Sequence, residues 1–186
     1  HSLAAWPLVC RPMSNGRLGI LNLGLQNDAL LLKHLNKFYN KMDVPWVTLI
    51  WDTYYAASPP QVTQSCCSFW WRDCCAILHD LKDMSICKPA KGNTVLLWKD
   101  IWQEDTLVNI FPQLHSYAKD DNITIATAIN TTENDFYSMF HLPMSSIAVQ
   151  QSQVLYNILR NDTSRDNNDT WQFKSQSKHY SNKRIY

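Results

Sequence analysis

The sequence predicts a mainly α fold that contains one small β-hairpin and ends in a poorly ordered C-terminal tail. Apolar residues recur at intervals of three and four over several stretches, which is the spacing of an amphipathic helix. Only the stretch near residues 85–98 combines short apolar runs with a turn signal. The chain has 186 residues, 45% of them hydrophobic. A chain of this length buries roughly 70% of its unfolded surface, so its apolar content suffices for a core.

The first helix is predicted over residues 25–40. One stripe of this segment is apolar and a second set of apolar side chains lies beside it, which makes a wide core-facing surface. The stripe consists of Leu25, Ala29, Leu32, Leu35 and Tyr39, with Leu31 and Phe38 beside it. Lys33, Lys37 and Lys41 recur every four residues on the other side.

Two further helices follow. Pro45 suits a helix start, and a helical spacing of apolar residues comes after it until Ser58-Pro59-Pro60 ends the run. Ser68 is a favourable N-cap for a helix to about residue 81. The apolar residues expected to face inward are Val47, Ile50, Trp51 and Tyr54 in the first of these helices, and Trp71, Cys75 and Leu78 in the second.

The hairpin is predicted from Ile86 and residues 95–97, which flank a turn signal at 90–93. A helix over 107–118, a short extended run at 123–125 and a helix over 146–159 complete the body. Residues 161–169 are polar and are expected to form a flexible linker. Residues 171–186 look strand-like but carry too few apolar side chains for a core, so we expect them to fray without a pairing partner.

One N-terminal run of residues resembles a known family. Residues 6–23 contain Trp6, then Val9-Cys10-Arg11-Pro12, then Asn15-Gly16-Arg17-Leu18-Gly19-Ile20, and lead directly into the first helix. This order resembles the segment that follows the polymerase core in reverse transcriptases of LINE-type (non-LTR) retroelements, particularly those of plants. In that family a Gly pair stands where this chain has Asn15-Gly16-Arg17.

The resemblance continues in order through most of the chain. Residues 68–73 look like the family's Phe-Trp-x-x-Val segment. Residues 92–102 look like its Gly-x-x-x-x-x-Phe-Trp-x-Asp-x-Trp segment, and Phe111-Pro112 follows at the usual place. The run from Asp169 to Trp171, followed by residues 180–186, looks like the opening of the family's reverse transcriptase zinc-binding domain.

The resemblance implies three segments. Residues 1–60 would be a thumb-like helical segment, residues 61–160 a helical connector that includes the hairpin near 85–98, and residues 161–186 a linker with the truncated start of the zinc-binding domain. Because the chain opens on His1 within a motif, we expect a fragment of a longer reading frame, with the rest of the parent polyprotein as one partner.

We expect no catalytic activity from these residues. The family's polymerase holds two metal ions with a Tyr-x-Asp-Asp hairpin and a third Asp, and this chain has no such hairpin. Asp120-Asp121 is its only Asp pair, and Asn122 follows it without an aromatic hairpin before it. This pattern is typical of a solvated loop. No cofactor is expected.

Cysteine spacing leaves a metal site as an alternative to apolar filling. Cys75 and His79 are four residues apart on a predicted helix, and Cys87 follows, so these three side chains form a zinc-site hypothesis. The chain has no Cys-x-x-Cys pair, and free cysteines commonly fill cores as small apolar side chains. We favour the core interpretation for the cysteines.

The distribution of charge suggests contact with a polyanion. The net charge is only +1, but residues 171–186 carry four basic residues and no acid. Residues 1–41 carry one acid, Asp28, and five basic residues: Arg11, Arg17, Lys33, Lys37 and Lys41. Basic side chains gain affinity for nucleic acid by releasing counterions from its phosphates. The alternative is a solvated helix face that keeps the protein soluble.

Aromatic residues offer a second hypothesis for contact with nucleic acid. Trp98, Trp102 and Phe111 lie near Lys99, an arrangement that would suit the stacking of single-stranded bases, although aromatics at this spacing are more often core. No apolar run approaches the length of a membrane span, so we expect no membrane partner. If expressed, the protein is expected inside the cell, in the nucleus or cytoplasm.

The sequence therefore predicts a non-catalytic fragment of a retroelement reverse transcriptase that contacts an RNA or DNA primer-template duplex through its basic N-terminal helix. The alternative is an inert, decayed fragment or a stand-alone protein interaction module without nucleic-acid binding.

Overall fold

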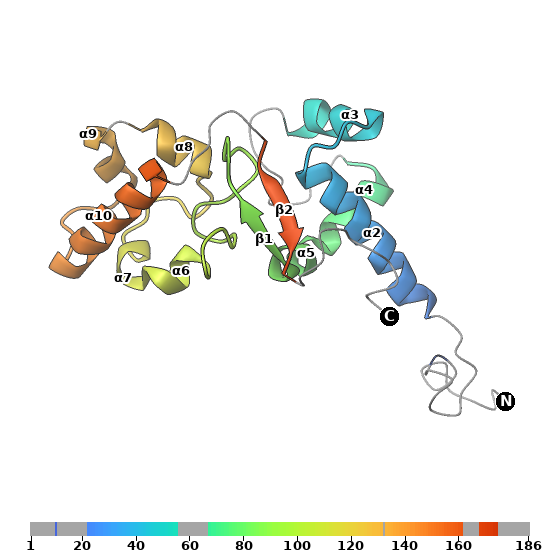
Figure 1. Ribbon diagram of the computed structural model, residues 1–186, viewed down its shortest axis with the longest axis horizontal. Coiled ribbons are helices and arrows are strands. Elements are labelled where there is room, and N and C mark those ends of the chain that lie inside the picture. The colour runs from blue at the N-terminus through green and yellow to red at the C-terminus, as the bar shows by residue number, and fades with distance from the viewer. Residues whose placement is uncertain (1–9, 11–21, 56–66, 132, 162–167, 175–186) are drawn as a thin grey trace.

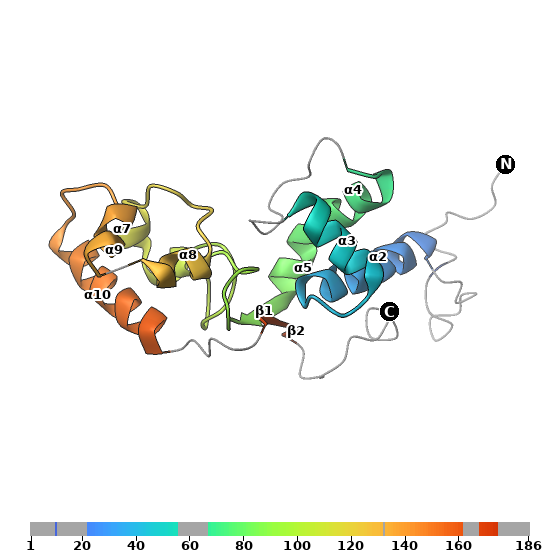
Figure 2. The ribbon, with the colours of Figure 1, turned by 90° about the horizontal axis from the view of Figure 1, so that it is seen from above.

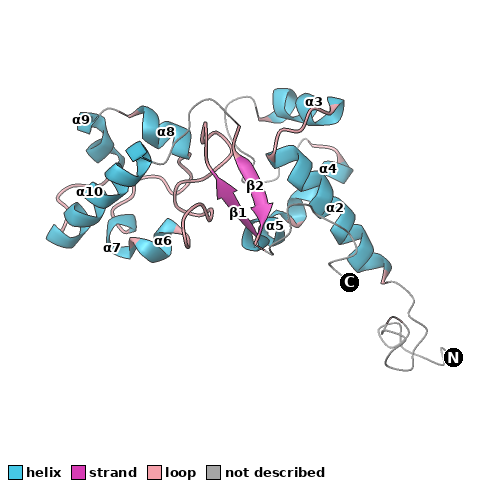
Figure 3. Cartoon of the chain, viewed as in Figure 1, coloured by secondary structure: helices cyan, strands magenta, loops and turns pink. Residues whose placement is uncertain are grey.

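The computed structural model describes residues 10, 22–55, 67–131, 133–161 and 168–174. Helices dominate the described chain, and a two-stranded sheet lies near its middle (Figure 3). Helices α2 to α5 lie on one side of this sheet and helices α6 to α10 on the other (Figures 1 and 2). The prediction of a mainly α fold with a small antiparallel sheet is confirmed, whereas the division into three segments stays a prediction.

Helix α2, Leu23–Tyr39, is the first predicted helix. Its N-cap is Asn22, whose side-chain oxygen accepts hydrogen bonds from the N–H groups of Gly24 and Leu25. Leu25 is half exposed, so the buried stripe begins one turn later than predicted. The stripe consists of Ala29, Leu31, Leu32, Leu35, Phe38 and Tyr39.

Helix α3, Pro45–Tyr54, begins at the predicted proline and buries Val47, Ile50 and Trp51. Its predicted end at 58–60 lies outside the described residues. The next helix starts at the predicted cap, where Ser68 Oγ accepts from the N–H of Trp71 at 3.2 Å. It runs as two pieces, α4 (Phe69–Ala76) and α5 (Leu78–Met84). The chain turns at Ile77, whose N–H donates to the Cys74 carbonyl three residues back, so the prediction of one unbroken helix is wrong.

The sheet pairs two segments that are far apart in the sequence. Strand β1 (Ser85–Lys88) is antiparallel to β2 (Thr170–Phe173), and Ser85 lies opposite Phe173. The predicted strand at Ile86 is confirmed, but its predicted partner at 95–97 is wrong, because Leu96 makes only an isolated bridge with Thr124. The prediction that the C-terminal strand lacks a partner is wrong for β2. Residues 175–186 lie outside the described residues.

The remaining helices are short except the last. They are α6 (Leu107–Ile110), α7 (Pro112–His115), α8 (Ile125–Asn130), α9 (Glu133–Phe136), the 3₁₀ helix η2 (Tyr137–Met139) and α10 (Ser146–Asn161). The predicted helix over 107–118 is broken because Pro112 has no N–H for a helical bond. The predicted α10 is confirmed, whereas α8 and α9 were not predicted. Within the described residues, no helix has the length and hydropathy needed to cross a membrane.

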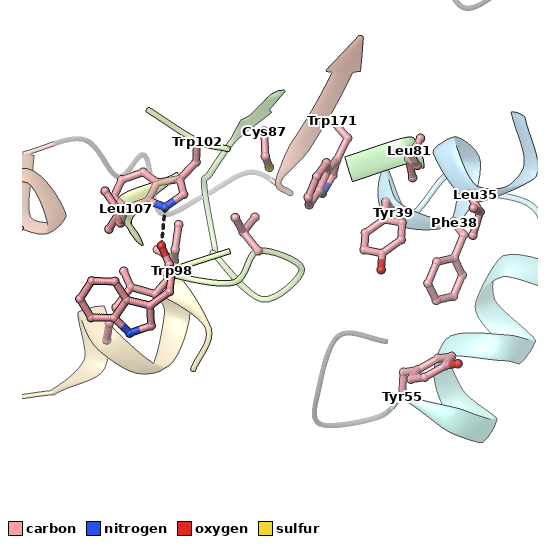
Figure 4. Close-up of a cluster of buried hydrophobic side chains, with 14 of the residues drawn as sticks. Leu35, Phe38, Tyr39, Tyr55, Leu81, Cys87, Trp98, Trp102, Leu107 and Trp171 are labelled. Atoms are coloured by element: carbon pink, nitrogen blue, oxygen red, sulfur yellow. Dashed lines mark hydrogen bonds between the residues drawn. The ribbon is translucent and has the colours of Figure 1, made fainter. Parts of the chain in front are cut away.

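The buried side chains from both sides of the sheet form one cluster. Phe38 stacks on Trp51 with ring centroids 4.5 Å apart, and Tyr39 packs on Trp171 of β2 at 5.1 Å. Figure 4 shows Tyr39 between Trp171 and the side chains of α2. On the other side of the sheet, Trp102 Nε1 donates to the Leu97 carbonyl at 3.0 Å (Figure 4). The sheet therefore connects two groups of helices through a shared core.

Replacing Trp171 by Ala should lower the free energy of unfolding by about 3–5 kcal/mol, since the change empties a buried indole site beside Tyr39. Urea denaturation followed by circular dichroism measures the change. Phe69→Ala is the matched control, because Phe69 is 73% exposed and its loss should cost less than about 0.5 kcal/mol. Equal effects of the two variants would contradict the packing described here.

Candidate nucleic-acid interface

The basic residues predicted to bind nucleic acid are distributed unevenly. Arg11 and Arg17 lie outside the described residues. Lys33 is exposed and Lys37 half-buried on α2. Lys41 lies beyond the helix end with a φ of +45°. Of the three lysines predicted to recur along the helix, only Lys33 and Lys37 therefore lie on it. The Lys41 ammonium lies 4.4 Å from the centre of the Trp51 ring, a cation–π contact.

An aromatic cluster lies beside Lys33 and Lys37. It consists of His34 of α2, Trp46 of α3 and Trp70 of α4, with ring centroids 5.3–5.5 Å apart. All three pairs meet edge to face, which is the favoured arrangement for aromatic quadrupoles. Each ring is only partly buried. The cluster therefore joins three helices at the surface rather than inside the core.

Lys33 adjoins His34 on α2, and Lys37 follows one turn later, so both lysines are on the same part of the helix as this ring. Burial lowers the pKa of His34, and the positive charges of Lys37 and Lys33 lower it further. The Nδ1 atom of His34 is buried and has no hydrogen-bond partner among the described residues. A neutral imidazole suits these surroundings better than a charged one, because the lysines already supply positive charge there.

Three exposed apolar side chains lie close in sequence to members of the aromatic cluster, on the same helices. Leu30, four residues before His34, is 41% exposed, and Leu49, three residues after Trp46, is 66% exposed. Phe69 precedes Trp70 and is 73% exposed. Exposed rings next to ammonium groups offer stacking platforms for bases together with charges for phosphates. The sequence analysis missed the aromatic cluster because its members come from three helices.

Lys99 does not lie beside accessible rings. Trp98, Trp102 and Phe111 are all buried, so they belong to the core and not to a stacking surface. Lys99 itself is exposed and donates to Asn122 Oδ1 at 2.8 Å. The stacking hypothesis at this site is therefore wrong, and the core interpretation is right.

The three residues of the zinc-site hypothesis have different environments. Cys87 is buried in β1, Cys75 is half-buried in α4, and the exposed His79 of α5 pairs with Asp83 at 3.0 Å. In the described part of the chain, no three His, Cys, Asp or Glu side chains gather closely enough to hold a metal ion. Burial raises the pKa of Cys75 to about 11 and that of Cys74 to about 12, which disfavours the thiolate that zinc requires.

Asp169 has a role that the sequence analysis missed. This carboxylate, in the predicted flexible linker, is buried and accepts four hydrogen bonds. Its Oδ1 accepts from the N–H groups of Ala90 and Gly92 at 2.8 and 2.6 Å, and its Oδ2 accepts from the N–H and Oγ1 of Thr94 at 2.9 and 2.8 Å. Residues 90–94 therefore form a nest around an anion that the chain itself supplies. The linker prediction is wrong at this residue.

Asp100 is the second buried carboxylate. Its Oδ2 accepts from the N–H of Leu96 at 2.7 Å, and its Oδ1 pairs with Lys82 of α5 at 2.7 Å. Asp120 and Asp121, by contrast, are exposed in a turn, where Asp121 meets His115 at 3.0 Å. The expectation of a solvated loop at this Asp pair is confirmed.

In comparisons with known proteins, no protein-family model, no curated protein and no solved structure matches this chain.

Iodoacetamide at pH 8 should alkylate Cys74 and Cys75 of the native protein slowly, because their raised pKa values leave almost no thiolate. Relative to the urea-unfolded chain, the rate should fall by about two orders of magnitude at Cys75 and by about three at Cys74. Peptide mapping by mass spectrometry measures the rates residue by residue. Native rates close to those of the unfolded chain would show that these thiols are neither buried nor suppressed.

His34 should titrate below pH 6.5 in the native protein, and Lys37→Gln should raise its pKa by removing one nearby positive charge. Because the unfolded chain binds this proton more tightly, the stabilising contribution of neutral His34 is present above pH 6.5. It is lost as the pH falls from there toward the lower pKa of the folded state.

The His34 imidazole resonances in a proton NMR titration, assigned with a His34→Gln variant, report the pKa directly. A value of 6.5 or higher, or one that Lys37→Gln leaves unchanged, would contradict the proximity of the lysines.

Proposed function

We propose that this chain is a non-catalytic segment of a LINE-type retroelement reverse transcriptase, comprising thumb-side helices and the connector toward the zinc-binding domain. Its role is to hold the primer-template duplex against helices α2 to α4. The proposal assigns no catalytic group to these residues. Chemistry would belong to the polymerase core of the parent protein.

The observation that supports the proposal most directly is the position of Lys33 and Lys37 beside the aromatic cluster of His34, Trp46 and Trp70. On α2, Leu30 and Lys37 are seven residues apart and so share one side of the helix. Neither lysine makes an ion pair with a carboxylate among the described residues. Their ammonium groups are therefore available to phosphate oxygens.

The arrangement separates two kinds of contact. The lysines interact with phosphates by charge and without regard to sequence. The exposed ring of Phe69 and the outer edges of the two tryptophans supply apolar contact to sugars or to an unpaired base at the primer end. A thumb needs such contacts because it must retain duplexes of any sequence.

A second candidate function is a protein interaction module without nucleic-acid binding. The same surface exposes Leu30, Leu49 and Phe69, which favours contact with an apolar partner surface. An inert, decayed fragment is the remaining possibility. The salt dependence of binding separates these candidates, because an apolar contact gains nothing from counterion release.

The double variant Lys33→Gln/Lys37→Gln should bind a labelled primer-template duplex more weakly than the unchanged chain. Loss of two phosphate contacts should reduce the slope of log K against log salt by about 1.8. Fluorescence anisotropy over a salt series measures both quantities, and a circular dichroism melt confirms that each protein is folded.

The matched control is Lys88→Gln/Lys119→Gln, which removes the same charge from two exposed positions away from α2. The proposal requires the α2 variant to lose more affinity than this control. Equal losses would mean that overall charge governs binding, and the absence of binding by the folded, unchanged chain would favour the interaction module.

A further inference from the structure

A polar pocket lies where the end of α2, the loop of residues 90–94 and the start of β2 meet. Its volume is about 120 Å³, several times the space that one water molecule needs. The buried Tyr39, Thr94 and Asp169 form its floor. Four exposed side chains form its rim: Lys41, Lys91, Asn93 and Asn168.

The two lysines of this rim have no carboxylate partner among the described residues. Asp169 is the carboxylate that lines the same pocket as the two lysines. Its two oxygens already accept four hydrogen bonds, which fill the lone-pair positions of a carboxylate. The lysines therefore cannot donate to it without displacing one of these donors. Lys41 also contacts the Trp51 ring at 4.4 Å, but a ring face carries no net charge, so the ammonium groups of both lysines still lack an anionic partner among the described residues.

The charge and the hydrogen-bond donors of the rim indicate which kind of ligand the pocket would bind. Two ammonium groups supply positive charge, and two side-chain amides supply further N–H donors. Donors of this kind around a small pocket match a compact oxyanion with several acceptor oxygens. The buried charge of Asp169 leaves the lining with one net positive charge, so a phosphate group fits better than a neutral ligand.

We propose that this pocket is a phosphate-binding site, with Lys91 and Lys41 as the cationic ligands and Asn93 and Asn168 as amide donors. The phosphate is either free or part of a nucleic acid. The site is independent of the α2 surface, because it shares none of the residues Lys33, Lys37, His34, Trp46 and Trp70.

The test is a titration of the isotopically labelled full chain with inorganic phosphate at constant ionic strength, followed by amide NMR shifts. We expect saturating shifts at Asn93, Thr94 and Asn168. Lys91→Gln should weaken the affinity by about fivefold, because it removes one exposed charge contact, and Lys88→Gln should leave it unchanged. Lys91 is exposed, so the substitution leaves the core intact, and a thermal melt checks this.

Two oligonucleotides that differ only in a 5′-phosphate identify the source of the group. A stronger effect of the phosphorylated one identifies a terminal phosphate, equal effects of the two identify backbone phosphodiesters, and a response to inorganic phosphate alone identifies a free anion. Each of these results supports the site. The absence of saturating shifts, or equal affinities for Lys91→Gln and Lys88→Gln, would overturn it.

The Lys33→Gln/Lys37→Gln variant separates this site from the proposed function. If the pocket binds phosphate, this variant should retain the inorganic phosphate shifts even where its duplex binding is lost. Loss of the phosphate shifts in this variant would place the anion on α2 instead and would overturn the assignment to the pocket.

Discussion

The carboxylate of Asp169 is the interaction on which the rest of the structure depends. It fixes residues 90–94 from a position 75 to 79 residues later in the chain. The loop it holds includes Gly92, whose φ of +71° favours glycine, and a side chain there would meet the backbone of Ala126 at 2.7 Å. Because Asp169 directly precedes β2, the same bonds place Trp171 against Tyr39 and bring the two groups of helices together.

A second buried charge reinforces this junction. Asp100 is fully buried and pairs with Lys82, whose ammonium also lies 5.8 and 5.9 Å from the ring centres of Tyr39 and Trp171. Burying an ion pair costs solvation, so its contribution to stability is small, but the loss of either partner is severe. Gly92 and Asp100 each have a structural role in this junction, Gly92 in the loop that binds Asp169 and Asp100 in the ion pair with Lys82.

The sequence predicted the elements whose apolar residues face one core. Apolar residues recur with a period of 3.6 in the helix around Leu35 and in the helix around Leu155. The cap at Ser68 was predictable because its hydrogen bond joins residues only three positions apart. The pairing of Ser85 with Phe173 could not be predicted, because a turn signal at 90–93 reports only on neighbours and those residues bind Asp169 instead. From the sequence alone, Asp169 is predicted to be a polar linker residue. Its burial depends on hydrogen-bond donors that lie 75 to 79 residues earlier in the chain, which no local pattern reveals.

The candidate sites were likewise predictable only where they depend on residues that are close in the sequence. Lys33 and Lys37 were identified from their spacing on one helix. The cluster that gives them a context joins His34, Trp46 and Trp70 from three helices, and its edge-to-face contacts arise only when those helices pack. The pocket between Lys41 and Lys91 likewise depends on the positive φ of Lys41 and on the bound carboxylate, neither of which a local pattern reveals.

The reciprocal hydrogen bonds between Asn40 and the backbone of Trp171 have a consequence for synthesis on the ribosome. These residues are 131 positions apart, and Asn40 both accepts from the N–H and donates to the carbonyl of Trp171. At 5–20 residues per second, roughly 7 to 26 s separate their emergence. During that interval Trp171 has not yet been synthesised, so the ring of Tyr39 and this edge of α2 remain exposed on the nascent chain.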